Sequence, residues 1–178
     1  MNAKGSVLRH TSSQHGFTLV ELLVTVLLAV VFAAVAVPSF RALVTESQLT
    51  GKSNELVQSF LLARSEALKR GGSVRISAKA DDGTWGQGWT VWQDADSDGE
   101  IDAAEIIQVS DSLSDSLTIV EENSAGGFTY LSNGLVNQAG RFSICRESGE
   151  SGRSIRIGAT GKAAVRADDC IAEEEEAS

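Results

Sequence analysis

The sequence has 178 residues, of which 42% are hydrophobic and 22% are charged. These proportions are typical of one globular domain with an appendage, and they exclude a wholly disordered or collagen-like chain. The formal net charge of −9 excludes a general attraction to nucleic acid, so any such binding would need a local basic patch. The two histidines, His10 and His15, precede the one long apolar segment. If the residues before that segment are removed, no histidine is left, which excludes Ser-His-Asp and Cys-His catalysis and argues against an enzyme.

Residues 17–37 (FTLVELLVTVLLAVVFAAVAV) form an apolar segment of 21 residues whose single charge is Glu21. As a helix this segment would span about 32 Å, enough to cross a bilayer core of about 30 Å. It therefore predicts a transmembrane helix, with a buried helix of a soluble domain as the alternative. Lys4 and Arg9 precede it with no acidic residue beside them, which favours a cytoplasmic N-terminus and a periplasmic remainder.

The sharpest boundary in this region is the Gly16–Phe17 bond, where a polar leader meets the first apolar residue. Cleavage at this bond would keep the apolar helix in the mature protein, unlike cleavage of an ordinary secretory signal. Phe17 would then carry a free α-amino group about one helical turn from Glu21. A carboxylate in hydrocarbon is costly and is usually paired or functional. Glu21 could pair with this amino group within one chain or between staggered chains; alternatively, it protonates or reaches the interface.

The stretch GFTLVELLVTVLLAVVFAAVAVPSF, residues 16–40, resembles the N-terminal signature of type IV pilins and type II secretion pseudopilins. In that family a prepilin peptidase cleaves after a glycine and methylates the new N-terminus, and these positions correspond to Gly16 and Phe17. The resemblance assigns filament assembly to Phe17, Glu21 and the helix-kinking Pro38. It implies the prepilin peptidase and other major and minor pilins or pseudopilins as partners. The implied location is the bacterial inner membrane, with the head in the periplasm, and then a pilus or pseudopilus.

A helical pattern continues beyond Pro38, with an apolar stripe of Leu49, Leu56, Phe60, Ala63 and Ala67 and glycines at 71 and 72 to end it. From residue 73 the periodicity changes to two, and the candidate strands are 73–79, 89–93, 106–110, 117–121, 128–131, 141–145 and 154–157. The sequence thus predicts an α+β, pilin-like fold in which a long bent N-terminal helix, transmembrane in its first half, packs on an antiparallel β-rich head. The expected parts are a cleaved leader (1–16), the transmembrane helix and filament spine (17–37), its amphipathic continuation (38–72), the head (73–172) and an acidic disordered tail (173–178).

Short segments of the head, LLARSEALKRGGSVRIS, WGQGWTVWQDADSDGEIDAAE and ATGK, resemble the globular domain of minor pilins of the FimT/FimU type and of H-type pseudopilins. The acidic tail departs from that pattern. The resemblance implies a minor pilin of a type IV pilus that acts in an initiation or tip complex and supports pilus biogenesis, twitching motility or adhesion. The alternatives are a DNA-binding minor pilin for natural transformation and an H-type minor pseudopilin of type II secretion.

Residues 94–105 (DADSDGEIDAAE) match the calcium-loop pattern D-x-D-x-D-G-x5-E at each required position. Calcium would take carboxylate, main-chain carbonyl and water-mediated contacts in such a loop. The six candidate ligands are Asp94, Asp96, Asp98, Glu100 (through its carbonyl), Asp102 (through water) and Glu105. Because strands rather than helices are expected on both sides, this is not a complete EF-hand, and a solvated acidic hairpin loop is the alternative.

Cys145 and Cys170 are the only cysteines. The expected periplasmic location favours a disulfide between them, which would stabilise the fold by about 3–4 kcal/mol in the chain-entropy model. Two independent buried thiols are the alternative.

Residues 141–166 contain six cationic residues against two acidic ones. Within them, residues 152–156 (GRSIR) are interpreted as a loop in which Arg153 and Arg156 contact phosphate, which makes DNA a candidate partner. The alternative is that these arginines pair with nearby acids. Trp85, Trp89 and Trp92 could stack bases, but such residues more often fill a β core, and alternation places Trp92 on the face opposite Trp89.

Overall fold

A computed structural model describes residues 17–96, 98–123, 125–146, 152–168 and 170. The predicted leader and the predicted acidic tail both lie outside the described residues. The chain divides into two units, residues 1–41 and residues 42–178.

The described part of the first unit is the beginning of helix α1 (Leu19–Arg70). This part contains a window of mean hydropathy 2.8 with no buried residue, long and apolar enough to cross a membrane by length and composition. Helix α1 is continuous through Pro38, although a proline removes one main-chain hydrogen bond from a helix. In the turn that contains this proline, the Ser39 hydroxyl donates to the carbonyl of Val35 at 3.2 Å.

The second part of α1, from residue 42 onward, belongs to the globular head. The predicted apolar stripe is confirmed, because its five members Leu49, Leu56, Phe60, Ala63 and Ala67 are all fully buried. Their spacing of three, four or seven residues places them on one face of the helix. The helix ends at Arg70, where Gly71 takes a φ of 65° that favours glycine.

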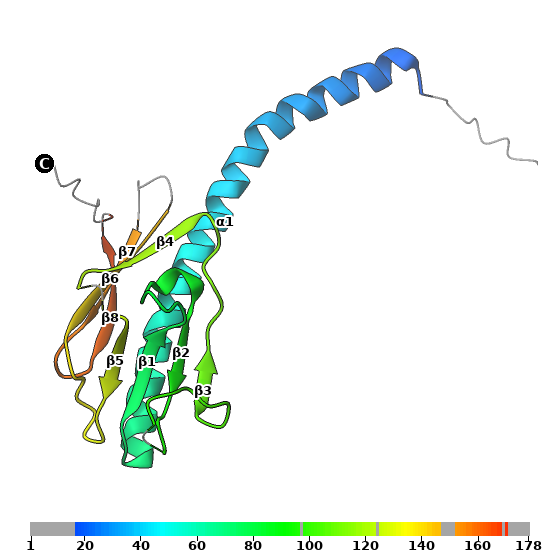
Figure 1. Cartoon of the computed structure of the whole chain (residues 1–178). Coiled ribbons are helices and arrows are strands. Elements are labelled where there is room, and N and C mark those ends of the chain that lie inside the picture. Colours follow the sequence, from blue (N-terminus) through cyan, green and yellow to red (C-terminus); the bar gives the residue numbers. More distant parts are fainter. Residues whose placement is uncertain (1–16, 97, 124, 147–151, 169, 171–178) are drawn as a thin grey trace, which may run out of the picture. The chain divides into compact units, whose positions relative to one another are not determined.

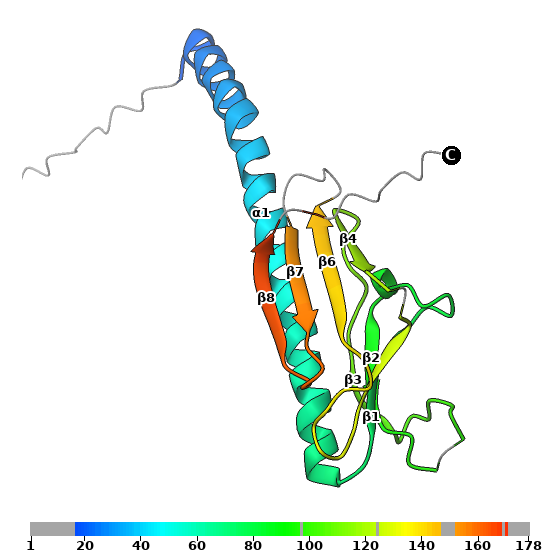
Figure 2. The same ribbon diagram turned by 90° about the vertical axis from the view of Figure 1, so that its left-hand side faces the viewer.

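Two antiparallel sheets of four strands complete the head (Figures 1 and 2). The first sheet has the order β3-β2-β1-β5, built from Ile106–Val109, Trp89–Trp92, Val74–Ala78 and Gly127–Tyr130. The second has the order β4-β6-β7-β8, built from Leu117–Glu121, Gly140–Arg146, Gly152–Ile157 and Ala163–Asp168. A short 3-10 helix, η1 (Trp85–Gln87), precedes β2. The seven predicted strands are confirmed with small shifts at their ends, whereas β8 was not predicted.

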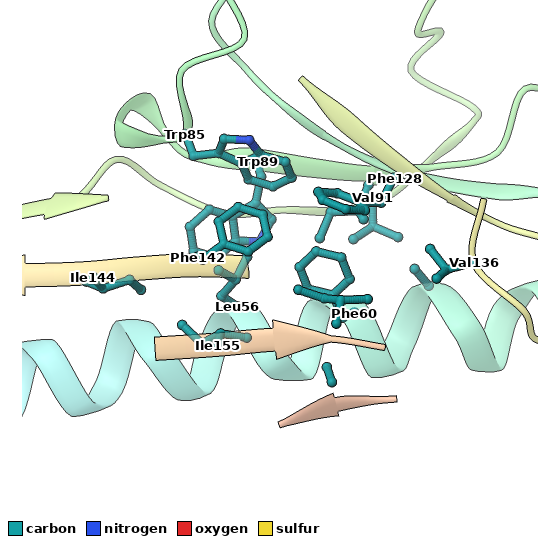
Figure 3. Packing of buried hydrophobic residues seen from close by; sticks show 14 of the residues in the cluster. Leu56, Phe60, Trp85, Trp89, Val91, Phe128, Val136, Phe142, Ile144 and Ile155 are labelled. Atoms are coloured by element: carbon teal, nitrogen blue, oxygen red, sulfur yellow. The ribbon is translucent and has the colours of Figure 1, made fainter. Parts of the chain in front are cut away.

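The core of the head lies between α1 and the inner faces of both sheets, and Phe60 occupies its centre (Figure 3). The Phe60 ring centroid is 5.4 Å from that of Phe128 in the first sheet and 5.7 Å from that of Phe142 in the second. These contacts are edge-on or tilted, which is the favoured geometry for aromatic pairs. One helical side chain thus contacts both sheets.

The two tryptophans of β2, Trp89 and Trp92, lie on opposite faces of the first sheet as alternation predicts. Trp89 is fully buried in the core, where its indole N–H donates to the Ser59 hydroxyl at 2.9 Å. Trp92 pairs with Arg75 in the register of β1 and β2, and its indole N–H donates to Ser77 at 3.0 Å. Because Trp85, Trp89 and Trp92 are at most 4% exposed, a base-stacking platform made from them is wrong.

Candidate functional site

The start of α1 places Glu21 in the first helical turn, close to the predicted new N-terminus. The Thr18 hydroxyl accepts a hydrogen bond from the N–H of Glu21 at 3.2 Å, and the Thr18 carbonyl accepts one from the N–H of Leu22 at 3.1 Å. Thr-x-x-Glu is the capping-box pattern, in which the threonine satisfies main-chain donors that the helix leaves free. This cap fixes where the helix begins relative to Phe17 and Glu21.

The side chains of residues 17–40 are all exposed, and apart from Thr18, Glu21, Thr25 and Ser39 they are apolar. Phe17, Phe32 and Phe40 are 75%, 73% and 68% exposed, respectively. A helix that is hydrophobic all round needs lipid or other protein to cover it. Glu21 is the only charged residue among residues 17–37, so it is the only side chain there that can form an ion pair. The arrangement is suited to insertion in a bilayer and to packing against similar helices.

The acidic loop between β2 and β3 brings three predicted calcium ligands together. Carboxylate oxygens of Asp94, Asp96 and Asp98 lie within 4.8 Å of one another, and Oδ1 of Asp94 is buried without a hydrogen-bond partner. Glu105 is buried in the turn just before β3, where its carboxylate accepts hydrogen bonds from the N–H groups of Ala95 at 2.5 Å and Asp102 at 3.4 Å. The flanking elements are strands, as expected.

The charge in this loop affects the ionisation of Asp96. The N–H of Asp98 donates to the Asp96 carboxylate and lowers its pKa, but desolvation and the negative charges of Asp98, Glu105 and Asp102 together outweigh this bond and raise the pKa. Such mutual repulsion among carboxylates is what a divalent cation relieves. The calcium site stays a prediction from the sequence pattern, and the carboxylate geometry is compatible with it.

We expect millimolar calcium to raise the melting temperature of the protein if this loop binds the ion. A ligand present at a hundred times its dissociation constant stabilises a fold by about 2.7 kcal/mol. Asp96→Asn should remove most of the increase because it removes a charged ligand, whereas Glu100→Gln should keep it because only the main-chain carbonyl of Glu100 would bind. Calcium-dependent melting followed by circular dichroism tests this prediction. An unchanged melting temperature for the unaltered chain would refute it.

The predicted disulfide joins Cys145 at the end of β6 to Cys170 beyond β8. Residues 142 and 144 of β6 face the core, so Cys145 lies on the opposite, outer face of the sheet. Gly152 of β7 pairs with Cys145, and a Cβ at position 152 would lie only 2.6 Å from Sγ of Cys170. The disulfide passes close over Gly152 of β7, and the absence of a side chain at this residue makes room for it.

The predicted arginine pair is not brought together by the fold. Gly152–Ile157 is strand β7, so the interpretation of GRSIR as a phosphate-binding loop is wrong. Ile155 and Ile157 point into the core, which places Arg153 on the core side of the strand and Arg156 on its outer face. DNA binding through Arg153 and Arg156 stays a prediction, and it would have to involve two different faces of one strand.

Arg153 pairs with an acid, as the alternative held, but with one that is distant in the sequence. Nη2 of Arg153 lies 2.7 Å from Oε1 of Glu46 on α1, and Arg146 of β6 pairs with the other oxygen of the same carboxylate. Two guanidinium groups on one carboxylate tie α1 to the second sheet. The partners are about a hundred residues apart in the chain, and no local pattern signals such a contact.

A long N-terminal helix that is apolar and exposed in its first part, with its second part packed on antiparallel sheets, defines a pilin-like protein. The family described as "Type II transport protein GspH" matches residues 52–161. The "Prokaryotic N-terminal methylation motif" matches residues 11–37, a range that includes Gly16, Phe17 and Glu21. The chain belongs to the GspH family, whose members are structural pilins and pseudopilins rather than enzymes. It is a minor pilin or pseudopilin of the type IV pilus or type II secretion class.

Solved structures with the same fold come from both systems. The chain is similar to the type IV minor pilin FimU of Pseudomonas aeruginosa, with 23% identity and a TM-score of 0.57 over 71% of this chain and 96% of that one. It is also similar to the minor pseudopilin EpsH of the type 2 secretion system of Vibrio cholerae, with 20% identity and a TM-score of 0.52 over 67% of this chain and 97% of that one. At these identities the likeness concerns the fold. Among curated proteins, no match to the chain was found.

Proposed function

We propose that this chain is a minor pilin of a type IV pilus that is processed by prepilin peptidase, held in the inner membrane and assembled in the initiation or tip complex. The observation that carries the proposal is the exposed, predominantly apolar surface of residues 17–40, with Glu21 as its one carboxylate. In the membrane, lipid covers this surface. In a filament, the same helices of neighbouring subunits cover it, which adds a non-directional attraction between subunits.

Phe17 and Glu21 give this packing its register. After cleavage at Gly16, the amino group of Phe17 is the positive charge that best complements the Glu21 carboxylate. A charged pair surrounded by apolar side chains is costly to break, because each partner left alone would be buried without a counter-charge. Neighbouring helices therefore slide until an amino group meets a carboxylate, and that position sets the stagger between subunits.

An H-type minor pseudopilin of type II secretion is the second candidate. The family description, which names a type II transport protein, favours it. Both functions use the same membrane helix and the same head fold, so they differ in the partner subunits. The two candidates agree on a structural role in assembly, with no chemical reaction performed by the head.

Deletion of the gene distinguishes the two candidates. For a minor pilin, we expect surface pili to become scarce or absent while secreted enzymes still reach the medium. Electron microscopy of the cells and activity assays on the culture supernatant measure the two outcomes. Complementation with the intact gene should restore pili. Normal piliation with a loss of secretion would instead establish the pseudopilin function and refute the pilus proposal.

A further inference from the structure

A groove of about 310 Å³ lies on the outer face of β7 and β8 and on the turn that joins them. Its charged lining consists of Arg156, Lys162 and Arg166, and the hydroxyls of Ser154 and Thr160 add polar groups. No acidic side chain is among the described residues that line it. We refer to this feature as the basic groove. Its sign is opposite to that of the chain as a whole, which has a net charge of −9.

The three cations of the basic groove have no ion-pair partner among the side chains that the structure describes, in contrast to several other cations of the head. Elsewhere, Lys52 pairs with Glu55, Arg70 pairs with Glu66, and Arg153 pairs with Glu46. The three groove cations are instead exposed on one surface. Three like charges around one depression repel one another and attract an anionic group with several charges.

The disulfide holds Cys170, which follows β8, on this same surface. Cys145, Ser154 and Arg166 all belong to the outer face, because Ser143 pairs with Ser154 and Ser154 pairs with Arg166 in the strand registers. Cys170 must cross this face above Gly152 to bond with Cys145. Cys170, the last described residue, is therefore held on the face that carries the basic groove.

The spacing of the acids after Cys170 matches the spacing of the cations. Arg166 and Arg156 lie two and four residues along the strands from the pair Cys145–Gly152, which corresponds to about 7 and 13 Å. Lys162, in the turn beyond, lies roughly 20 Å along the same line. In an extended chain, residues three to six positions after Cys170 reach about 10 to 21 Å. These positions are Glu173, Glu174, Glu175 and Glu176.

We propose that the acidic segment Glu173–Glu176 occupies the basic groove of its own chain. Its four carboxylates would then lie beside the three groove cations, which have no other ion-pair partner among the described side chains. Each exposed ion pair contributes only about 0–1 kcal/mol, but the short tether holds the segment at an effective concentration in the millimolar range. Occupancy is consequently sensitive to salt. The segment competes with any external polyanion, nucleic acid included, for Arg156, Lys162 and Arg166.

A zero-length carbodiimide crosslink between a carboxylate and an amine tests this placement in the full chain held in detergent. Lys162 is the one amine in the groove, and Lys79 at the end of β1 is an exposed amine on the other sheet for comparison. We expect peptide mass spectrometry to find Glu173–Glu176 joined to Lys162 several-fold more often than to Lys79. The yield should not change on dilution, and it should be lost in high salt.

Two double variants with the same change in net charge provide the control. Arg156→Gln with Arg166→Gln should abolish the crosslink to Lys162, although Lys162 itself is retained. Lys69→Gln with Arg70→Gln, at the end of α1, should leave the crosslink in place. Equal crosslinking of Lys162 and Lys79, or an equal loss in both variants, would overturn the proposal. A crosslink that disappears on dilution or joins two chains would instead place the segment on a second copy, which also overturns it.

Discussion

Replacement of Glu21 by alanine should leave cleavage at Gly16 intact but reduce incorporation into filaments by roughly thirty-fold or more. Removing one member of a buried charge pair costs about 2 kcal/mol or more, and each 1.4 kcal/mol corresponds to about a factor of ten. We expect the effect on incorporation rather than on cleavage, because Glu21 is the only charged residue of the apolar segment that can pair with a neighbouring subunit. Quantitative immunoblotting of sheared filaments against the membrane fraction measures it.

Thr25→Ala provides a matched control for this experiment. Thr25 is one helical turn from Glu21 and is also exposed, and its hydroxyl donates to the carbonyl of Leu22 within the same helix at 2.9 Å. Its replacement removes a polar group without removing a charge, so incorporation should stay close to that of the unaltered chain. Incorporation of the Glu21→Ala chain at the normal level would rule out a role for this carboxylate in setting the stagger.

Phe60→Ala should destabilise the head by about 3–5 kcal/mol, the range for removal of a large buried aromatic side chain. Phe60 is fully buried and lies 5.4 to 6.4 Å, between ring centroids, from Phe128, Phe142, Trp85 and Tyr130. The cavity would therefore open where α1 meets both sheets, and neighbouring rings could fill it only by giving up their own contacts. Chemical denaturation followed by tryptophan fluorescence gives the free energy of unfolding.

Leu61→Ala is the appropriate comparison for Phe60→Ala. Leu61 is the next residue of the helix, but its side chain is 46% exposed, so its loss should change the free energy of unfolding by about 0.5 kcal/mol. Alanine is a better helix former than phenylalanine and only slightly better than leucine, so helix propensity cannot account for a larger loss of stability in Phe60→Ala. Similar losses for the two variants would contradict the central position of Phe60 in the core.

The helix, its buried stripe and most strands could be predicted because each depends on a local pattern. Leu49, Leu56 and Phe60 recur at helical spacing, and Trp89 and Val91 alternate with exposed or outward positions in a strand. Strand β8 escaped prediction because its sequence, AAVRAD, has mostly small or charged residues and only one β-branched residue. Its pairing with β7, rather than its own composition, makes it a strand.

The candidate sites depend more on contacts between residues that are far apart in the sequence. Local spacing therefore predicts which side chains converge in one case and fails to do so in another. The spacing of Asp94, Asp96 and Asp98 is local, and their carboxylates do converge. The grouping of Arg153 with Arg156 was also local, but it ignored strand alternation and the carboxylate of Glu46 on α1. The basic groove likewise arises only when the registers of β7 and β8 are known. Sequence proximity is therefore a poor guide to shared sites once residues lie on strands.

The disulfide also determines how the head responds to mechanical load. A pull applied between α1 and the chain beyond Cys170 passes through the bridge to Cys145, and so bypasses the two strands β7 and β8 enclosed between the cysteines. The two cysteines are 25 residues apart in the sequence, so the bridge prevents about 85 Å of chain from being extended. Neither strand can be peeled from the edge of its sheet by such a pull. Covalent closure thus makes the segment between Cys145 and Cys170 inextensible under tension.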